Sequence, residues 1–190
     1  MTLQHEVAND PDYIECLDLG FVGLIDHMGS DSAIVKAAQV SYGKGTKKSK
    51  DERSLIRYMM RHQHMSPFEM CEAKLHIKCP IFVIRQLVRH RTHNMNEYSG
   101  RYSVMTDEFY IPGLDSILPQ STANKQGRAG TLTDLQKMTY QQVIKDHSKT
   151  AYATYQVLLG EETEDDPGIA RELARLVLPL NVYTEFYYNM

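Results

Sequence analysis

The residues best suited to chemistry lie in one short stretch, RQLVRHRTHNMNEYSGRY, from Arg85 to Tyr102. Its four arginines and one carboxylate, that of Glu97, give it a formal charge of +3 in a chain of net charge −3. Guanidinium groups are planar and bind phosphate oxygens in pairs. Gly100 has no Cβ, so the backbone there can approach a ligand closely. The stretch therefore predicts a site for a small phosphorylated ligand such as a nucleotide monophosphate.

The spacing within this stretch is that of a helix followed by a turn. Arg85 and Arg89 are four residues apart, as are Gln86 and His90, so on a helix they would line adjacent strips. Each hydrogen bond to a charged group contributes about 1.5–3 kcal/mol, and micromolar binding needs about 8 kcal/mol, so several groups must converge. The alternative is a surface helix whose arginines pair with carboxylates elsewhere. Charge and spacing alone leave both interpretations open.

Composition excludes several classes of protein. At 190 residues, with 42% hydrophobic and 24% charged residues, the chain has the make-up of one globular domain. A pI near 6.2 provides no general attraction for nucleic acid. No apolar run reaches the roughly 18–20 residues of a membrane span. Three widely spaced cysteines without a secretory leader predict a reducing, cytoplasmic compartment, and the histidines lack the spacing of metal ligands.

The elements that must position the arginine-rich stretch follow from periodicity and from helix caps. Cys71 to Cys79 alternates apolar and polar residues, which predicts a strand with one buried and one wet face. Two further strands are expected, at Phe21–Met28 and Val182–Tyr188. Five helices are expected: one after the cap at Ser30–Asp31, one over Asp51–His62, one after Pro80, one over Thr133–Leu159, and one from a cap at Asp166-Pro167 to Pro179. Loops are expected at Lys44–Lys50 and Gly113–Thr131. The class is α+β, a single domain over residues 1–190 with an antiparallel or mixed sheet and flanking helices.

The order of the residues in the arginine-rich stretch resembles a known signature. Arg89-His90-Arg91, seven residues and then Ser99, within RHRTHNMNEYSGRY, is similar to the signature of the flavin-dependent thymidylate synthases. The resemblance extends to further segments: AAQVSYG near Ser41, HQHMSPFE (62–69), CPIFVIRQLVRHR (79–91), DEFYIP (107–112) and ARLVLPLNVYTEFYY (174–188). It covers the chain from about Phe21 to its end.

The resemblance implies a fold like that of the thymidylate synthase complementing proteins. It also implies the reaction that this family catalyses. Reduced FAD, recharged by NADPH, would mediate carbon transfer from methylenetetrahydrofolate to dUMP and supply the hydride. No protein nucleophile is needed, which agrees with Cys71 and Cys79 being read as inward-facing core residues. The resemblance also implies a homotetramer whose active sites are shared between chains, with the protein supplying binding, alignment and electrostatics.

The resemblance also implies roles for individual residues. The expected FAD contacts are Ser66, Arg89, His90, Arg91 and Glu97. The expected dUMP contacts are Gln86, Leu87, Val88 and Arg89 from one chain, then Glu97, Tyr98, Ser99, Gly100 and Arg101 from a neighbouring subunit, together with Arg175. His64 stands next to the flavin-binding turn, and its alternative role is that of a helix C-cap.

One departure bears on activity. Members of the family continue past the last strand into a helical segment that supplies asparagines to the flavin and an arginine that polarises the uracil, whereas this chain ends at Asn189-Met190. We therefore expect no certain catalytic residue in this chain, an aromatic strand at Phe186–Tyr188 with nothing to cover it, and impaired turnover. The hypotheses are then the methylating enzyme, a nucleotide- or flavin-binding protein without catalysis and, disfavoured by charge, a nucleic-acid binder.

Overall fold

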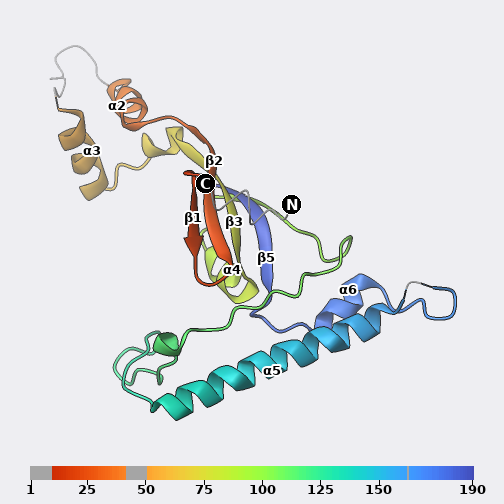
Figure 1. Ribbon diagram of the computed structural model, residues 1–190. Helices are drawn as coiled ribbons and strands as arrows, with labels where there is room; N and C mark the ends of the chain where they lie inside the picture. The colour runs from red at the N-terminus through yellow and green to blue at the C-terminus, as the bar shows by residue number, and fades with distance from the viewer. Residues whose placement is uncertain (1–9, 42–50, 162) are drawn as a thin grey trace.

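A five-stranded sheet lies at the centre of the chain in a computed structural model that describes residues 10–41, 51–161 and 163–190 (Figure 1). Its order is β1-β2-β3-β5-β4, and every pairing is antiparallel. The strands are β1 (Tyr13–Cys16), β2 (Gly20–Met28), β3 (Glu72–Pro80), β4 (Asn94–Glu97) and β5 (Tyr183–Asn189). The α+β prediction is confirmed, whereas the loop predicted at Lys44–Lys50 lies outside the described residues.

The helices are placed around and beyond this sheet. They are α2 (Asp31–Gln39), α3 (Glu52–Arg61), α4 (Ile81–Leu87), α5 (Asp134–Leu159) and α6 (Arg171–Ala174), with 3₁₀ turns at η1 (Phe68–Met70), η2 (Leu114–Ser116) and η3 (Arg175–Val177). Figure 1 shows α4 against the sheet, whereas α2 and α3 project beyond one end of it and α5 runs beyond the other. In the described part of the chain, no helix has the length and apolarity needed to cross a membrane.

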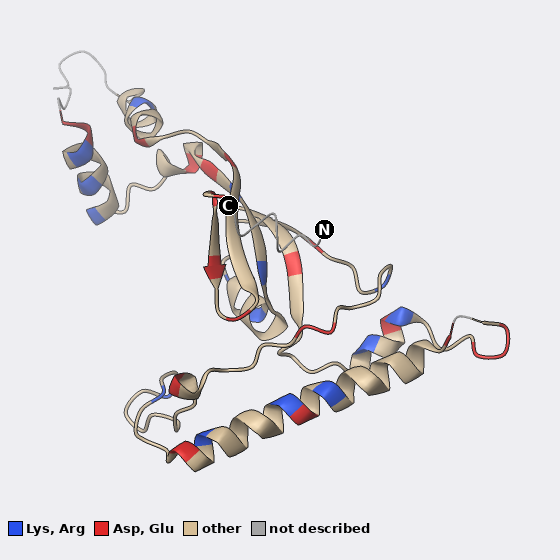
Figure 2. Cartoon of the chain, in the orientation of Figure 1, with Lys and Arg blue, Asp and Glu red and all other residues tan. Residues whose placement is uncertain are grey.

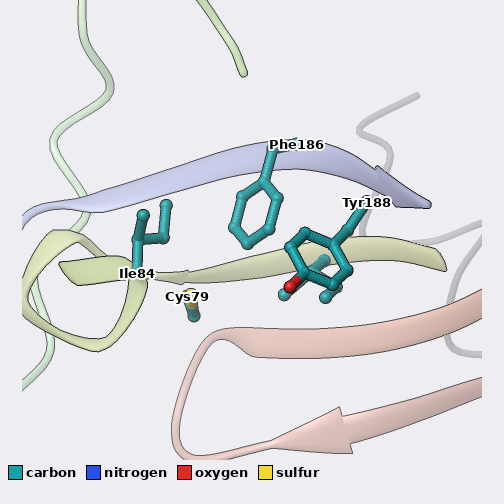
Figure 3. Packing of buried hydrophobic residues seen from close by; sticks show 5 residues of the cluster. Cys79, Ile84, Phe186 and Tyr188 are labelled. Atoms are coloured by element: carbon teal, nitrogen blue, oxygen red, sulfur yellow. The ribbon is translucent and has the colours of Figure 1, made fainter. Parts of the chain in front are cut away.

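Two apolar clusters hold these layers together. The first joins the sheet to α4 through Ile77, Cys79, Ile84, Phe186 and Tyr188, four of which are labelled in Figure 3. The second joins the C-terminal part of α5 to the segment before β5 through residues that include Tyr155, Ala174 and Val182. Tyr155 and Ala174 are fully buried. The first cluster therefore fixes α4 on one face of the sheet.

The opposite face of β3 is wet at Glu72 and Lys74, as predicted, whereas the prediction is wrong at His76 and Lys78. His76 is 5% and Lys78 7% exposed. His76 bridges the Tyr13 hydroxyl (2.9 Å) and the Glu185 carboxylate (2.6 Å), and the Lys78 ammonium donates to the Glu108 carboxylate at 2.8 Å. Buried polar groups are tolerated when they are hydrogen-bonded or paired. All three partners are distant in sequence, which explains why alternation alone misjudged these two positions.

The long helix matches its predicted bounds but not its predicted packing. Thr133 and Gln136 form a capping box at its start. The sequence predicts Leu135 and Met138 among the apolar positions of this helix, yet they are 75% and 58% exposed, because within this chain mainly the C-terminal half of α5 packs. The N-terminal half therefore leaves apolar side chains uncovered.

The C-terminal region corrects two further expectations. The last helix is α6, capped at Ala170 rather than at Asp166-Pro167, because Gly168 (φ 62°) turns the chain and the Ile169 amide donates to the Leu158 carbonyl at 2.8 Å. The aromatic strand is uncovered only at Tyr187, which is 46% exposed. Phe186 and Tyr188 are each 2% exposed, since β4 pairs with β5 and α4 lies over the same face.

Candidate functional site

The arginine-rich stretch begins on α4 but leaves the helix earlier than predicted. Leu87 is the last residue of α4, and Val88 is its C-cap. Both side chains pack against the first cluster, after which the Arg89 amide donates to the Gln86 carbonyl at 3.2 Å in a tight turn. Arg85 and Arg89 therefore do not share a regular helix. The prediction that they line one strip of a helix is wrong. The side chains of Leu87 and Val88 therefore pack in the core.

The arginines divide into two kinds. Arg85, Arg89 and Arg91 are exposed and form no ion pair within the residues that the structure describes. Arg101 pairs with Glu172 at 3.3 Å, both side chains being more than half exposed. The surface-pairing alternative therefore holds for Arg101 only. The other three guanidinium groups, with His90 also exposed beside them, remain available to an anion.

Glu97 is positioned by a strand that the sequence analysis missed. β4 pairs with β5 so that Glu97 lies opposite Phe186. Opposed residues share a face of a sheet, and so do residues two positions apart on one strand. Glu97 therefore lies on the face that α4 covers, together with Phe186 and Thr184. The Thr184 hydroxyl donates to the Glu97 carboxylate at 2.8 Å.

A cavity of ≈ 130 Å³ brings together four of the predicted substrate residues, Glu97, Tyr98, Gly100 and Arg175. A Cβ on Gly100 would lie 2.7 Å from the Met105 sulfur and 3.4 Å from the Arg175 Cδ. The glycine thus lets the turn pack against Arg175, a different reason from the ligand approach inferred from sequence. The cavity combines a carboxylate and a guanidinium, so it suits a ligand with both N–H donors and an anionic group.

The turn after β4 is closed by its own hydrogen bonds. The Tyr98 hydroxyl donates to the Val104 carbonyl at 2.8 Å, and the Ser99 hydroxyl accepts from the Arg101 amide at 3.3 Å. Arg171 of α6 donates to the Tyr102 carbonyl at 2.7 Å. Ser99 and Arg101 therefore belong to an ordered turn at the rim of the cavity, although neither lines it.

Ser66 lies in a different and larger cavity, of ≈ 660 Å³, between α2, α3 and η1. Its walls include Leu55, Tyr58, Met59 and His64, and none of the other predicted site residues lines it. The C-cap of α3 is His62. The alternative role of His64 as a helix C-cap is therefore wrong. One chain therefore carries two separate parts of the predicted site.

Cys79 is a buried thiol beside Glu97. Burial first, and then the negative charge of Glu97, raise the pKa of this thiol to about 12. At pH 9 on the order of one such thiol in a thousand is thiolate, and the thiolate is the nucleophile. Cys79 is thus a core residue, as the strand pattern predicted, whereas Cys71 is only half-buried.

We expect Cys79 to resist modification. With a disulfide reagent such as DTNB at pH 9, the folded protein should react at the half-buried Cys16 and Cys71 and at Cys79 only after denaturant is added. The denatured sample, which should give three equivalents, is the control. Rapid reaction of all three thiols in the folded protein would contradict this account of Cys79.

Fold and cavity together define an α+β protein with a small, anion-suited cavity beside an antiparallel sheet. The chain belongs to the family described as "Thymidylate synthase complementing protein", whose family model matches residues 23–190. It is 50% identical over 174 residues to a flavin-dependent thymidylate synthase of Ruegeria pomeroyi, covering 92% of this chain and 57% of that protein. It is 47% identical over 194 residues to one from Rickettsia bellii, covering 97% and 65%. The chain thus spans about three-fifths of the length of these relatives.

A solved structure agrees with this membership. The crystal structure of the UMP/dUMP methylase PolB from Streptomyces cacaoi, bound with 5-Br UMP, superposes with a TM-score of 0.76 at 37% identity. The match covers 94% of this chain and 74% of that one. The fold expected from the resemblance is confirmed.

Proposed function

We propose that this protein is a flavin-dependent thymidylate synthase, which methylates the uracil of dUMP to form dTMP. FAD would be the cofactor, methylenetetrahydrofolate the carbon donor and NADPH the reductant. The observation that carries the proposal is the cavity in which Glu97, Gly100 and Arg175 meet. The names of the relatives and the brominated nucleotide in PolB support the same class of substrate.

The roles of the chain's own residues follow from their charges. Arg175 in the cavity, with the exposed Arg89, would bind the phosphate oxygens of dUMP. The Glu97 carboxylate, an acceptor only, would accept from the uracil imide or a sugar hydroxyl. Gln86, exposed on α4, would offer its amide to the same ligand. Because Cys79 stays protonated, its thiol would not attack the base.

The larger cavity fits a planar ring system. Tyr58 and His64 provide aromatic surface there, Leu55 and Met59 apolar walls, and Ser66 a hydroxyl. Arg89, His90 and Arg91 would hold the phosphates of FAD, and Glu97 would lie between flavin and substrate. When bound, reduced FAD would supply the hydride and mediate the carbon transfer. The protein itself would bind, orient and exclude water.

The two cavities have no residue in common, which supports a homotetramer with sites shared between chains. Helix α5 offers a surface for such assembly. At about 3.6 residues per turn, its exposed Leu135 and Val157 fall roughly opposite the buried Ala151 and Tyr155, and the exposed Val143 lies beside Val157 on the flank of that apolar side. A helix that is apolar on two sides calls for a second partner.

Light scattering tests the assembly. The purified protein is expected at about four times the 21.8 kDa chain mass. Val143→Asp should shift it to smaller species, because a charge would be buried against the partner. Gln126→Asp, which adds the same charge in the exposed segment before α5, is the matched control. A monodisperse monomer, or a Val143→Asp variant that keeps the wild-type mass, would contradict this arrangement.

We place the reaction in the cytoplasm, in keeping with three free cysteines. The proposed ligands are small molecules rather than nucleic acid or a membrane. Lysines and aspartates are interspersed along α5 (Figure 2), and the net charge of the chain is −3. An extended polyanion therefore finds no general attraction.

Release of tritium from dUMP labelled at C5 tests the activity, since a methyl group at C5 replaces that hydrogen. With FAD, NADPH and methylenetetrahydrofolate, we expect tritium in water and a yellow, flavin-bound protein. Binding of FAD and dUMP without release would favour the alternative, a binding protein without catalysis.

A further inference from the structure

Thr184 is a buried polar residue to which the sequence analysis assigned no role. It lies in β5, paired with Cys79 of β3, and is 4% exposed. Its hydroxyl donates to Oε1 of Glu97 at 2.8 Å. Both residues line the ≈ 130 Å³ cavity that also contains Gly100 and Arg175. A side chain on a central strand thus reaches the carboxylate of an edge strand.

The hydrogen bond restricts a group that would otherwise be free to move. Glu97 is exposed and ends the four-residue strand β4, and an exposed glutamate samples several rotamers. β5 lies between β3 and β4, so the Thr184 backbone is held from both sides. No other described residue bonds to the second oxygen of Glu97, Oε2. One oxygen is therefore fixed, and the other remains for a ligand.

We propose that Thr184 is a positioning residue that holds the Glu97 carboxylate at the wall of the substrate cavity. The inference rests on the proposed function, in which Glu97 accepts a hydrogen bond from the nucleotide. Thr184 acts through Glu97, because its hydroxyl donates to that carboxylate. A pre-oriented acceptor binds its donor more tightly, since less rotamer freedom is lost on binding.

Two substitutions separate the hydroxyl from the volume of the side chain. Thr184→Val keeps the shape and removes the donor, whereas Thr184→Ser keeps the donor. In calorimetric titrations of the FAD-loaded protein, we expect Thr184→Val to weaken dUMP binding about tenfold and Thr184→Ser to stay within about twofold of wild type. In a Glu97→Ala background, Thr184→Val should have no further effect, as expected for residues acting as a pair. Equal losses in both backgrounds would overturn the proposal.

Crystal structures of the two variants keep this test independent of the proposed function. The Glu97 carboxylate should stay in place in Thr184→Ser and take other rotamers in Thr184→Val. If the wild-type protein binds no dUMP, the proposed function is wrong, and the crystals still decide the positioning. A Glu97 side chain that keeps its place in Thr184→Val would show that Thr184 does not position it.

Discussion

Arg175→Ala is expected to weaken dUMP binding by about 10- to 100-fold, the equivalent of one or two charge-assisted hydrogen bonds of about 1.5–3 kcal/mol. Arg175 lines the same cavity as Glu97 and packs against Gly100. It forms no ion pair with the residues that the structure describes, so its charge is available to a phosphate. Isothermal titration of the FAD-loaded protein with dUMP measures the change.

The control is Arg128→Ala, which removes an exposed arginine that lines neither cavity. It should leave the dissociation constant for dUMP unchanged. Arg175→Lys should recover part of the affinity, because lysine keeps the charge but loses the bidentate geometry. If Arg175→Ala and Arg128→Ala bind dUMP equally well, the phosphate lies elsewhere.

Phe186→Ala is expected to lower the free energy of unfolding by about 3–5 kcal/mol, because it removes a buried aromatic ring and leaves a cavity. Phe186 is 2% exposed in the cluster between the sheet and α4, with Ile84 and Tyr188 near it (Figure 3). Total stability is usually about 5–15 kcal/mol, so the variant should be near the limit of folding. Urea denaturation followed by circular dichroism measures the loss.

Phe186→Leu is the matched control, since leucine fills most of the same space and should cost clearly less. The same residue lies opposite Glu97 in the sheet. The alanine variant should therefore also lose dUMP affinity at temperatures where it is still folded. Unchanged stability in Phe186→Ala would mean that α4 is not held by this cluster.

Local patterns predicted most of the regular elements. The strand at 71–79 showed clear alternation, and the helix that begins after Thr133 showed its cap and its length, and both are present as β3 and α5. Neither pattern could show which partners cover an element. His76 and Lys78 are buried by Tyr13, Glu185 and Glu108, and all three partners belong to other strands or loops that a β3 pattern does not contain. For the same reason, the exposed apolar side of α5 was not foreseen.

The binding roles of the site residues stay predictions, and the structure divides those residues between two cavities. The order of residues pointed to Glu97, Gly100 and Arg175, which one cavity unites, and to Ser66, which it does not contain. Strand β4 escaped notice because Asn94–Glu97 is polar, short and exposed, so only its pairing with β5 makes it a strand.

Thr184 was missed although a signal was present. It stands two residues before Phe186 in a β-rich run, so both share the buried face. A threonine on a buried face needs an acceptor for its hydroxyl. That need could have flagged the residue, but only the pairing of β4 with β5 identifies Glu97 as the acceptor.

The central claim is that the cavity of Glu97, Gly100 and Arg175 recognises a phosphorylated pyrimidine. Calorimetric titration of the FAD-loaded protein with dUMP and, in parallel, with deoxyuridine tests it most directly. The account predicts micromolar binding of dUMP and an affinity for deoxyuridine at least about tenfold weaker, because the phosphate contacts are lost. Equal affinities for the two compounds, or no binding of either, would contradict it.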